Sequence, residues 1–175
     1  GIHQKRIRMK KLFLLLLSFA AIGLQGQIKY EDYFTDNTLR FDYQRCGNAA
    51  TEQIGFEQMK QEGKWSGPRT KLIDPFPWGE YRVELYDKSS KKLIYSRGYA
   101  GLYSEWQTTA EAKITSRCFY ETVLVPYPKK PATIMLYSRD RKTKLIKKFE
   151  YQIDPSSYFI SKETGPNYKS YMIHD

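Results

Sequence analysis

Apolar side chains recur at every second position through long parts of this chain. The alternation is clearest in three runs, whose apolar members are Leu39, Phe41 and Tyr43; Tyr81, Val83 and Leu85; and Phe149, Tyr151 and Ile153. Because successive side chains of a β-strand point to opposite faces, each run predicts a strand with one apolar face and one wet face. Such strands are typical of antiparallel sheets that pack one face on a core, so the pattern favours an all-β fold.

Three further runs are rich in β-branched and aromatic residues, which also favours strands, namely Lys92–Tyr99, Cys118–Val125 and Ala132–Ser138. Polar turn segments at Asp87–Lys91 and Arg139–Thr143 predict two hairpins. Helical signal is weaker and is limited to Ile54–Glu62 and to Thr108–Lys113, where Thr108 or Thr109 would be the N-cap. Together these patterns predict an antiparallel β-sandwich, immunoglobulin-like in general architecture, with one or two short helices.

The N-terminal part of the chain has the features of an export signal. Met9 and two lysines precede the apolar run Leu12–Leu24, which is too short to span a bilayer comfortably. We interpret residues 9–26 as a signal peptide and residues 1–8, which precede the methionine, as a spurious N-terminal extension. The mature protein would be periplasmic, at the cell surface or secreted, with no membrane span after signal removal.

The rest of the chain divides into a domain and a tail. The strand patterns lie within residues 28–155, which we predict to form the β-sandwich domain. Residues 156–175 are polar and rich in turn formers. We predict that they form a linker toward a further domain that this sequence does not contain.

Charge gives little support for a nucleic-acid partner. The net charge is +10, and half of it comes from basic residues within the first 26 positions, which leaves about +5 for the mature chain. The basic run Arg139–Lys148 could bind phosphate groups, but no aromatic residues interleave with its charges. A solvated hairpin tip that discourages edge-to-edge pairing is the simpler interpretation, so we expect no nucleic-acid partner.

The sequence offers no recognisable catalytic or metal-ligating set. Its two histidines are His3 and His174, and an H-E-x-x-H motif is absent. Ser–His or Cys–His catalysis would therefore lack a base within the domain. The acids Glu80, Glu84 and Glu105 are more simply explained as solvent-facing residues than as a glycosidase pair. We predict no catalytic residue, no metal ligand and no cofactor in this chain.

The cysteines allow two interpretations. Export would permit a disulfide between Cys46 and Cys118, whereas a single pair 72 positions apart does not amount to a disulfide framework. Two separate buried thiols are the favoured interpretation, and the disulfide is the alternative.

Aromatic residues are the strongest remaining signal, with fifteen tyrosines and three tryptophans. Exposed aromatics could form a binding surface for glycans or host proteins, and the candidates are Trp78, Tyr99, Tyr103 and Trp106. Large aromatic side chains also commonly fill the open end of a sandwich while their polar tips reach loop backbone. We expect Trp106 to fill such an end.

Several blocks in a fixed order resemble a known family. They are LIDPFPWGEYRVELYD (72–87), LIYSRGYAGLYSEWQTTAEAK (93–113), FYETVLVPYPKKP (119–131) and MLYSRDRK (135–142). The opening YEDYFTDNTLRFDY (30–43) and the closing FEYQIDPSSYFI (149–160) follow the same order. In these blocks the chain resembles the N-terminal domain of the secreted bacterial IgA-peptidase family, zinc metallo-endopeptidases common in gut Bacteroidetes.

The resemblance implies a β-sandwich that precedes a separate zinc-binding domain with an H-E-x-x-H motif. No position here matches a catalytic or zinc residue, so zinc is expected only in that absent domain. The implied function is a non-catalytic domain that packs against the downstream peptidase domain in cis or positions a protein or glycoprotein substrate. The alternative is a secreted module that binds glycans or host proteins through exposed aromatics. Both a truncated protease and a stand-alone module are compatible with the sequence.

Overall fold

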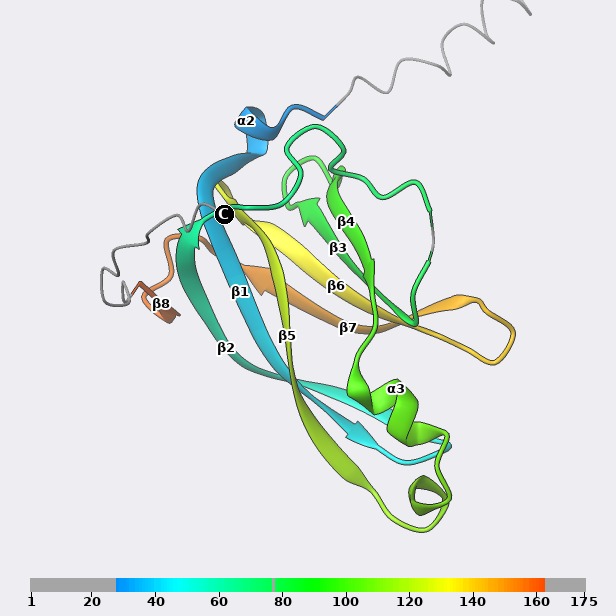
Figure 1. Cartoon of the computed structure of the whole chain (residues 1–175). Coiled ribbons are helices and arrows are strands. Elements are labelled where there is room, and N and C mark those ends of the chain that lie inside the picture. Colours follow the sequence, from blue (N-terminus) through cyan, green and yellow to red (C-terminus); the bar gives the residue numbers. More distant parts are fainter. Residues whose placement is uncertain (1–27, 77, 163–175) are drawn as a thin grey trace, which may run out of the picture.

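A computed structural model describes residues 28–76 and 78–162. The predicted extension (1–8), the signal peptide (9–26) and most of the predicted linker lie outside the described residues. Two four-stranded sheets face each other, with strand orders β5-β1-β2-β8 and β4-β3-β6-β7 (Figure 1). The first sheet contains β1 (Phe34–Gly47), β2 (Glu52–Lys64), β5 (Arg117–Pro128) and β8 (Ile160–Ser161). The second contains β3 (Tyr81–Asp87), β4 (Leu93–Tyr99), β6 (Ala132–Arg139) and β7 (Leu145–Ile153). The short helices are α2 (Tyr30–Tyr33), α3 (Leu102–Gln107) and the 3-10 turn η1 (Glu111–Lys113).

The pairing confirms the predicted antiparallel sandwich. Neighbouring strands are antiparallel throughout, except that β8 is parallel to β2. Both predicted hairpins are present, as β3–β4 and β6–β7. The alternation also predicts the buried positions of β3 correctly. Tyr81, Val83 and Leu85 are all buried, and Val83 and Leu85 belong to the apolar core shared with the opposite sheet.

The predicted helix at Ile54–Glu62 is wrong, because these residues belong to β2. The pairing with β1 shifts register between Phe56 and Gln58, which leaves Glu57 as an extra residue. Because of this bulge, the side chains of β2 that face the core change from even positions (Ile54 and Phe56) to an odd one (Met59). The resulting spacing imitates a helical face although the backbone is extended.

The segment between β4 and β5 contains more helix than the sequence indicated. The turn predicted at Thr108–Lys113 is present in part as η1, and the Ala112 amide donates to Thr109 Oγ1 over 3.3 Å. α3 precedes it, in a segment where no helix was predicted. The side chain of Tyr103 is fully buried, so packing at this position stabilises a helix that local propensity did not predict.

The sandwich extends beyond the predicted boundary at residue 155. Ile160 is 2% exposed and belongs to the core, and β8 pairs with Met59 and Lys60 of β2. The first part of the predicted linker is therefore a part of the domain. Within the described residues, no helix is long and apolar enough to cross a membrane.

The favoured interpretation of the cysteines as separate buried thiols is also wrong. A disulfide joins Cys46 and Cys118, which are directly opposite each other on β1 and β5. Cys118 is exposed and Cys46 is half-buried. The sequence could not show this relationship, because it depends on which strands pair and in which register.

Candidate functional site

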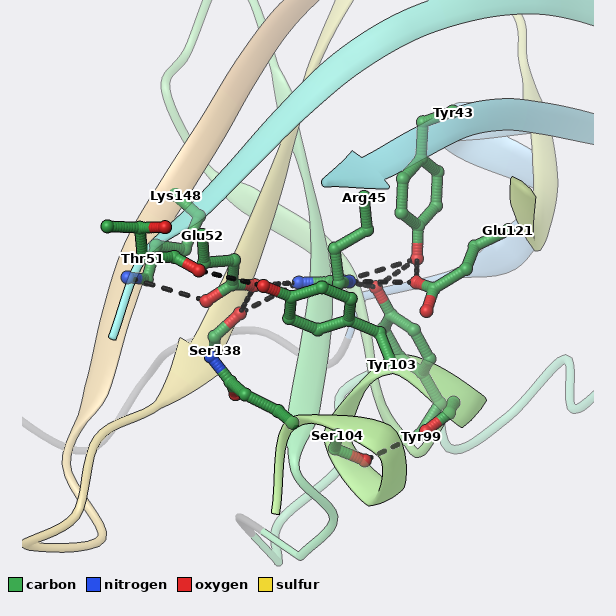
Figure 2. A network of polar contacts seen from close by, with 12 residues as sticks. Tyr43, Arg45, Thr51, Glu52, Tyr99, Tyr103, Ser104, Glu121, Ser138 and Lys148 are labelled. Atoms are coloured by element: carbon green, nitrogen blue, oxygen red, sulfur yellow. Dashed lines mark hydrogen bonds and ion pairs between the residues drawn. The ribbon is translucent and has the colours of Figure 1, made fainter. Parts of the chain in front are cut away.

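A charged side chain lies inside the sandwich, at the end where α3 is located (Figure 2). Arg45 on β1 is fully buried. Its Nε donates to Glu121 Oε2 over 2.9 Å, and its Nη1 donates to Ser138 Oγ over 2.9 Å and to Glu52 Oε1. Its guanidinium carbon lies 3.7 Å from the centre of the Tyr81 ring, which adds a cation–π contact. The guanidinium of Arg45 therefore contacts polar groups of β2, β5 and β6 and the aromatic face of Tyr81 on β3.

The Arg45 network, as we call these contacts, connects the two sheets. Arg45, Glu52 and Glu121 come from the first sheet, and their contacts with Ser138 and Tyr81 reach β6 and β3 of the second. Without the partners on the other strands, these polar groups would be buried in the sandwich with no hydrogen bonds, which costs free energy. The pairing of the sheets provides partners for most of these groups, and among the described residues Glu121 Oε1 and the Tyr81 hydroxyl remain buried without a hydrogen-bond partner.

Two tyrosine hydroxyls extend the network. Tyr43 donates to Glu121 Oε2 over 2.8 Å, and its oxygen lies 2.9 Å from the Tyr99 hydroxyl. Burial raises the pKa of Tyr99 to about 12, against a smaller opposite effect of the Arg45 charge. Burial raises the pKa of Tyr43 as well. Both hydroxyls are therefore neutral hydrogen-bonding groups at neutral pH.

Two carboxylates that lie close together can act as an acid and a base in catalysis, and Glu52 and Glu121 are such a pair. The Glu52 side chain is 8% exposed and the Glu121 side chain is 10% exposed, and both form ion pairs with Arg45. Glu52 is also 3.4 Å from Lys148 Nζ. Both carboxylates are therefore held by Arg45 and have little surface open to an outside substrate. This arrangement stabilises the contact between sheets rather than providing an accessible reaction centre.

Sequence analysis did not identify Arg45, although a signal was present. The inward positions Leu39, Phe41 and Tyr43 continue by the same period to Arg45. An arginine on the apolar face of a strand requires a buried partner. The partners come from β2 and β5, whose pairing the sequence did not reveal.

The four predicted binding residues do not form one surface. Trp78 is 74% exposed and lies before β3. Tyr99 belongs to the Arg45 network, and Tyr103 is fully buried, with its hydroxyl donating to Thr51 O over 2.7 Å. Trp106 is half-buried beside Tyr103, and its Nε1 donates to Glu111 Oε2 over 3.0 Å. Tyr103 fills this end of the sandwich with Trp106 packed on it, and Trp78 lies on the outer surface.

An exposed aromatic surface lies near the C-terminal end of the described residues. Tyr158 and Phe159 are 95% and 85% exposed, and their rings meet edge to face with centroids 6.2 Å apart. Beside them Phe56 and Tyr151 stack with centroids 4.3 Å apart, and Phe56, Tyr151 and Phe159 line one depression. We call these four residues the C-terminal aromatic surface. Tyr158 and Phe159 were predicted to lie in a linker. Two adjacent aromatic residues in an otherwise polar segment were a signal of an interaction surface.

The backbone that carries this surface is fixed on both sides. Asp154 Oδ1 accepts the Ser156 amide over 2.9 Å, and Tyr127 OH donates to Pro155 O over 2.8 Å. On the other side Ile160 is buried in the core. The exposed aromatic pair is therefore presented on a turn held by the domain.

No group of three or more His, Cys, Asp or Glu side chains in residues 28–76 and 78–162 is arranged to hold a metal ion. Zinc does not fit any site in this part of the chain. A family model described as peptidase M64 N-terminus matches residues 29–150. No curated protein matches the chain significantly.

Proposed function

The chain belongs to the peptidase M64 N-terminus family, and we propose that it is the non-catalytic N-terminal domain of a secreted zinc metallo-endopeptidase. We call that longer product the parent protein. In it, the β-sandwich would pack against the following peptidase domain and help to position its protein substrate. The family supports the assignment as an N-terminal domain of a peptidase. The C-terminal aromatic surface supports the packing role.

The observation that carries the packing role is the exposure of Tyr158 and Phe159 on a fixed turn. Contiguous exposed apolar groups mark interaction sites more often than isolated ones do. Their position directly precedes β8, after which the chain continues to residues 163–175. A following domain would start within reach of the C-terminal aromatic surface. Packing in cis costs less than association between separate chains, because a linker gives the two domains a high effective concentration.

The non-catalytic role is supported by how the acids are used. Glu52 and Glu121 are committed to Arg45. Glu84 pairs with Arg82 Nε over 2.8 Å and accepts from Tyr86 OH over 2.7 Å. These carboxylates are hydrogen-bonded within the domain and not directed at an open cleft.

Export is a separate part of the proposal. Disulfides persist in oxidising compartments outside the cytosol, and the Cys46–Cys118 bridge agrees with such a location. It fits the signal-peptide interpretation of residues 9–26. N-terminal sequencing of the protein recovered from its native host tests this point, and a mature chain beginning near residue 27 is the expected result.

The gene provides the simplest test of the parent protein. We expect the reading frame to continue beyond the codon of Asp175 and to encode an H-E-x-x-H motif. The purified 175-residue chain should not hydrolyse peptides when zinc is added. Zinc-dependent hydrolysis by this chain, abolished by a chelator, would contradict the non-catalytic role.

A paired substitution in the parent protein tests the packing role. Y158S/F159S should lower the thermal stability of the peptidase domain or its activity on a protein substrate. The control is L102S/I114S, which removes another pair of exposed apolar side chains from a different surface. Equal effects of the two double variants, or no effect of Y158S/F159S, would argue against packing through the C-terminal aromatic surface.

A further inference from the structure

The fold brings exposed aromatic residues beside the most basic hairpin of the domain. The segment before β3 carries Phe76 and Trp78, and it reaches the base of the β6–β7 hairpin (Figure 1). Trp78 and Glu80 from this segment line one open depression together with Arg139 and Thr143 from the hairpin. Sequence analysis gave the basic hairpin no binding role, because no aromatic residues interleave with its charges. In the folded chain, a distant segment supplies the aromatic residue.

Arg139 fixes the hairpin to the aromatic segment. Its Nε donates to Gly79 O over 2.8 Å, its Nη1 donates to Thr143 O over 2.6 Å, and its amide donates to Glu80 O over 2.8 Å. These hydrogen bonds therefore fix the position of the hairpin relative to the aromatic segment on the other side of the depression. A site organised in this way loses less conformational entropy when it binds a ligand.

The aromatic segment is also anchored on its other side. Asp74 Oδ2 accepts the Gly98 amide over 3.2 Å, and Asp74 Oδ1 accepts the Phe76 amide over 3.0 Å. A Cβ at Gly98 would lie 2.0 Å from Trp78 O, so the backbone of Trp78 lies directly on β4. The indole is nevertheless 74% exposed, and Phe76 meets it edge to face at a centroid distance of 6.5 Å. The Trp78 indole is therefore an exposed apolar face on a supported backbone.

The hairpin tip adds positive charge next to that face. Arg141, Lys142 and Lys144 are exposed at the tip around Thr143. Two acids lie in the same region. Asp140 Oδ1 accepts the backbone amides of Lys142 and Lys144, and Glu80 is exposed at the edge of the depression. Positive charge exceeds negative charge here, and Glu80 adds a hydrogen-bond acceptor.

From this combination we propose that the surface formed by Phe76, Trp78, Glu80 and the hairpin tip of residues 139–144 binds an acidic saccharide. The C–H face of a sugar ring packs on the Trp78 indole. A carboxylate or sulfate on the saccharide interacts with the cations of the tip, and Glu80 accepts a sugar hydroxyl. The site is separate from the C-terminal aromatic surface and does not depend on the parent protein having a peptidase domain.

Binding to the 175-residue chain can be measured by calorimetry and by Trp fluorescence. The probes are a sulfated heparin-derived hexasaccharide, a carboxylated oligogalacturonate of similar length and neutral maltohexaose. We expect binding of at least one acidic probe, weakening as salt rises because the charges are exposed, and much weaker binding of maltohexaose. The acidic probe that binds identifies whether sulfate or carboxylate is preferred.

Two variants locate the site, and each has a matched control. Trp78→Ala should weaken binding by about tenfold, whereas Tyr158→Ala, which removes another exposed aromatic ring, should leave it unchanged. R141Q/K142Q should weaken binding and reduce its salt dependence. K88Q/K130Q removes the same charge at the opposite end of the second sheet and should have little effect.

Three results would overturn the proposal. One is the absence of binding to both acidic probes, and another is equal binding to maltohexaose. The third is an equal loss of affinity in the control variants, which would indicate non-specific charge attraction. Because Trp78 and the tip residues are exposed, the variants should remain folded, and unchanged thermal unfolding verifies this.

Discussion

Arg45 and Glu121 form an ion pair of 2.9 Å inside the sandwich, with the arginine side chain fully buried and the glutamate side chain 10% exposed. They lie on neighbouring strands of one sheet, and Arg45 also reaches Ser138 of the other. A buried ion pair gives little net stability compared with apolar residues of the same size, but the removal of one partner is costly. The Arg45 network therefore links the two sheets, and we expect it to add little to the net free energy of folding.

The first prediction concerns Arg45→Met. This change leaves Glu121 buried without a cation and Glu52 with only Lys148, and it should lower the free energy of unfolding by about 3–5 kcal/mol. Urea denaturation measures the difference. The control is Lys147→Met, which breaks an exposed pair with Glu150 and should cost less than about 1 kcal/mol. Similar small losses in the two variants would show that the network is not important for stability.

The second prediction concerns acid stability and Asp42. Burial would raise the pKa of this carboxyl, but hydrogen bonds from Arg40, Thr122 and Gln58 outweigh it and lower the pKa to about 2. Between pH 4 and 2 the unfolded chain therefore binds more protons at this residue, so its contribution is present above about pH 4 and is lost as the pH falls toward 2. Asp42→Asn should flatten the decrease in stability over this range. An unchanged pH profile would contradict the assignment.

The third prediction concerns the disulfide. Reduction of Cys46–Cys118 should lower the free energy of unfolding by about 2–4 kcal/mol, because the bridge restricts the unfolded chain. Thermal unfolding with and without a reductant measures this. C46S/C118S should resemble the reduced protein and should no longer respond to reductant. If reductant has the same effect on the variant, the loss does not come from this bridge.

The fourth prediction compares two adjacent residues beyond the expected domain boundary. Ile160→Ala should lower the free energy of unfolding by about 2–5 kcal/mol, because it creates a cavity in the core. Phe159→Ala should change it by no more than about 0.5 kcal/mol in the isolated domain, because the ring is exposed. Equal effects would show that β8 does not belong to the folded unit.

The sequence predicted those strands whose alternation is uninterrupted. On β3 the apolar positions Tyr81, Val83 and Leu85 are also the buried positions, so period and burial agree. On β2 the extra residue Glu57 breaks the period, and the strand was predicted as a helix for that reason. Asp42 shows another limit, because it lies on the outward face predicted to be wet but is covered by its own hydrogen-bonding partners.

Relationships between distant strands could not be predicted from local patterns. The Cys46–Cys118 bridge and the Arg45–Glu121 pair both depend on the register of β1 with β5. The surface that combines Trp78 with the β6–β7 hairpin depends on another distant pairing, that of β3 with β6. The order of the family blocks did predict the family correctly, because a family model for the peptidase M64 N-terminus matches residues 29–150.

The most direct test of the accessory role is hydrogen–deuterium exchange on the parent protein and on the isolated 175-residue chain. If the domain packs through the C-terminal aromatic surface, the backbone amides of residues 156–161 will exchange more slowly in the parent protein. The segment that carries Phe76 and Trp78, which lies on another surface, will exchange equally in the two proteins. Equal exchange of residues 156–161 in the parent protein and the isolated chain would contradict the account.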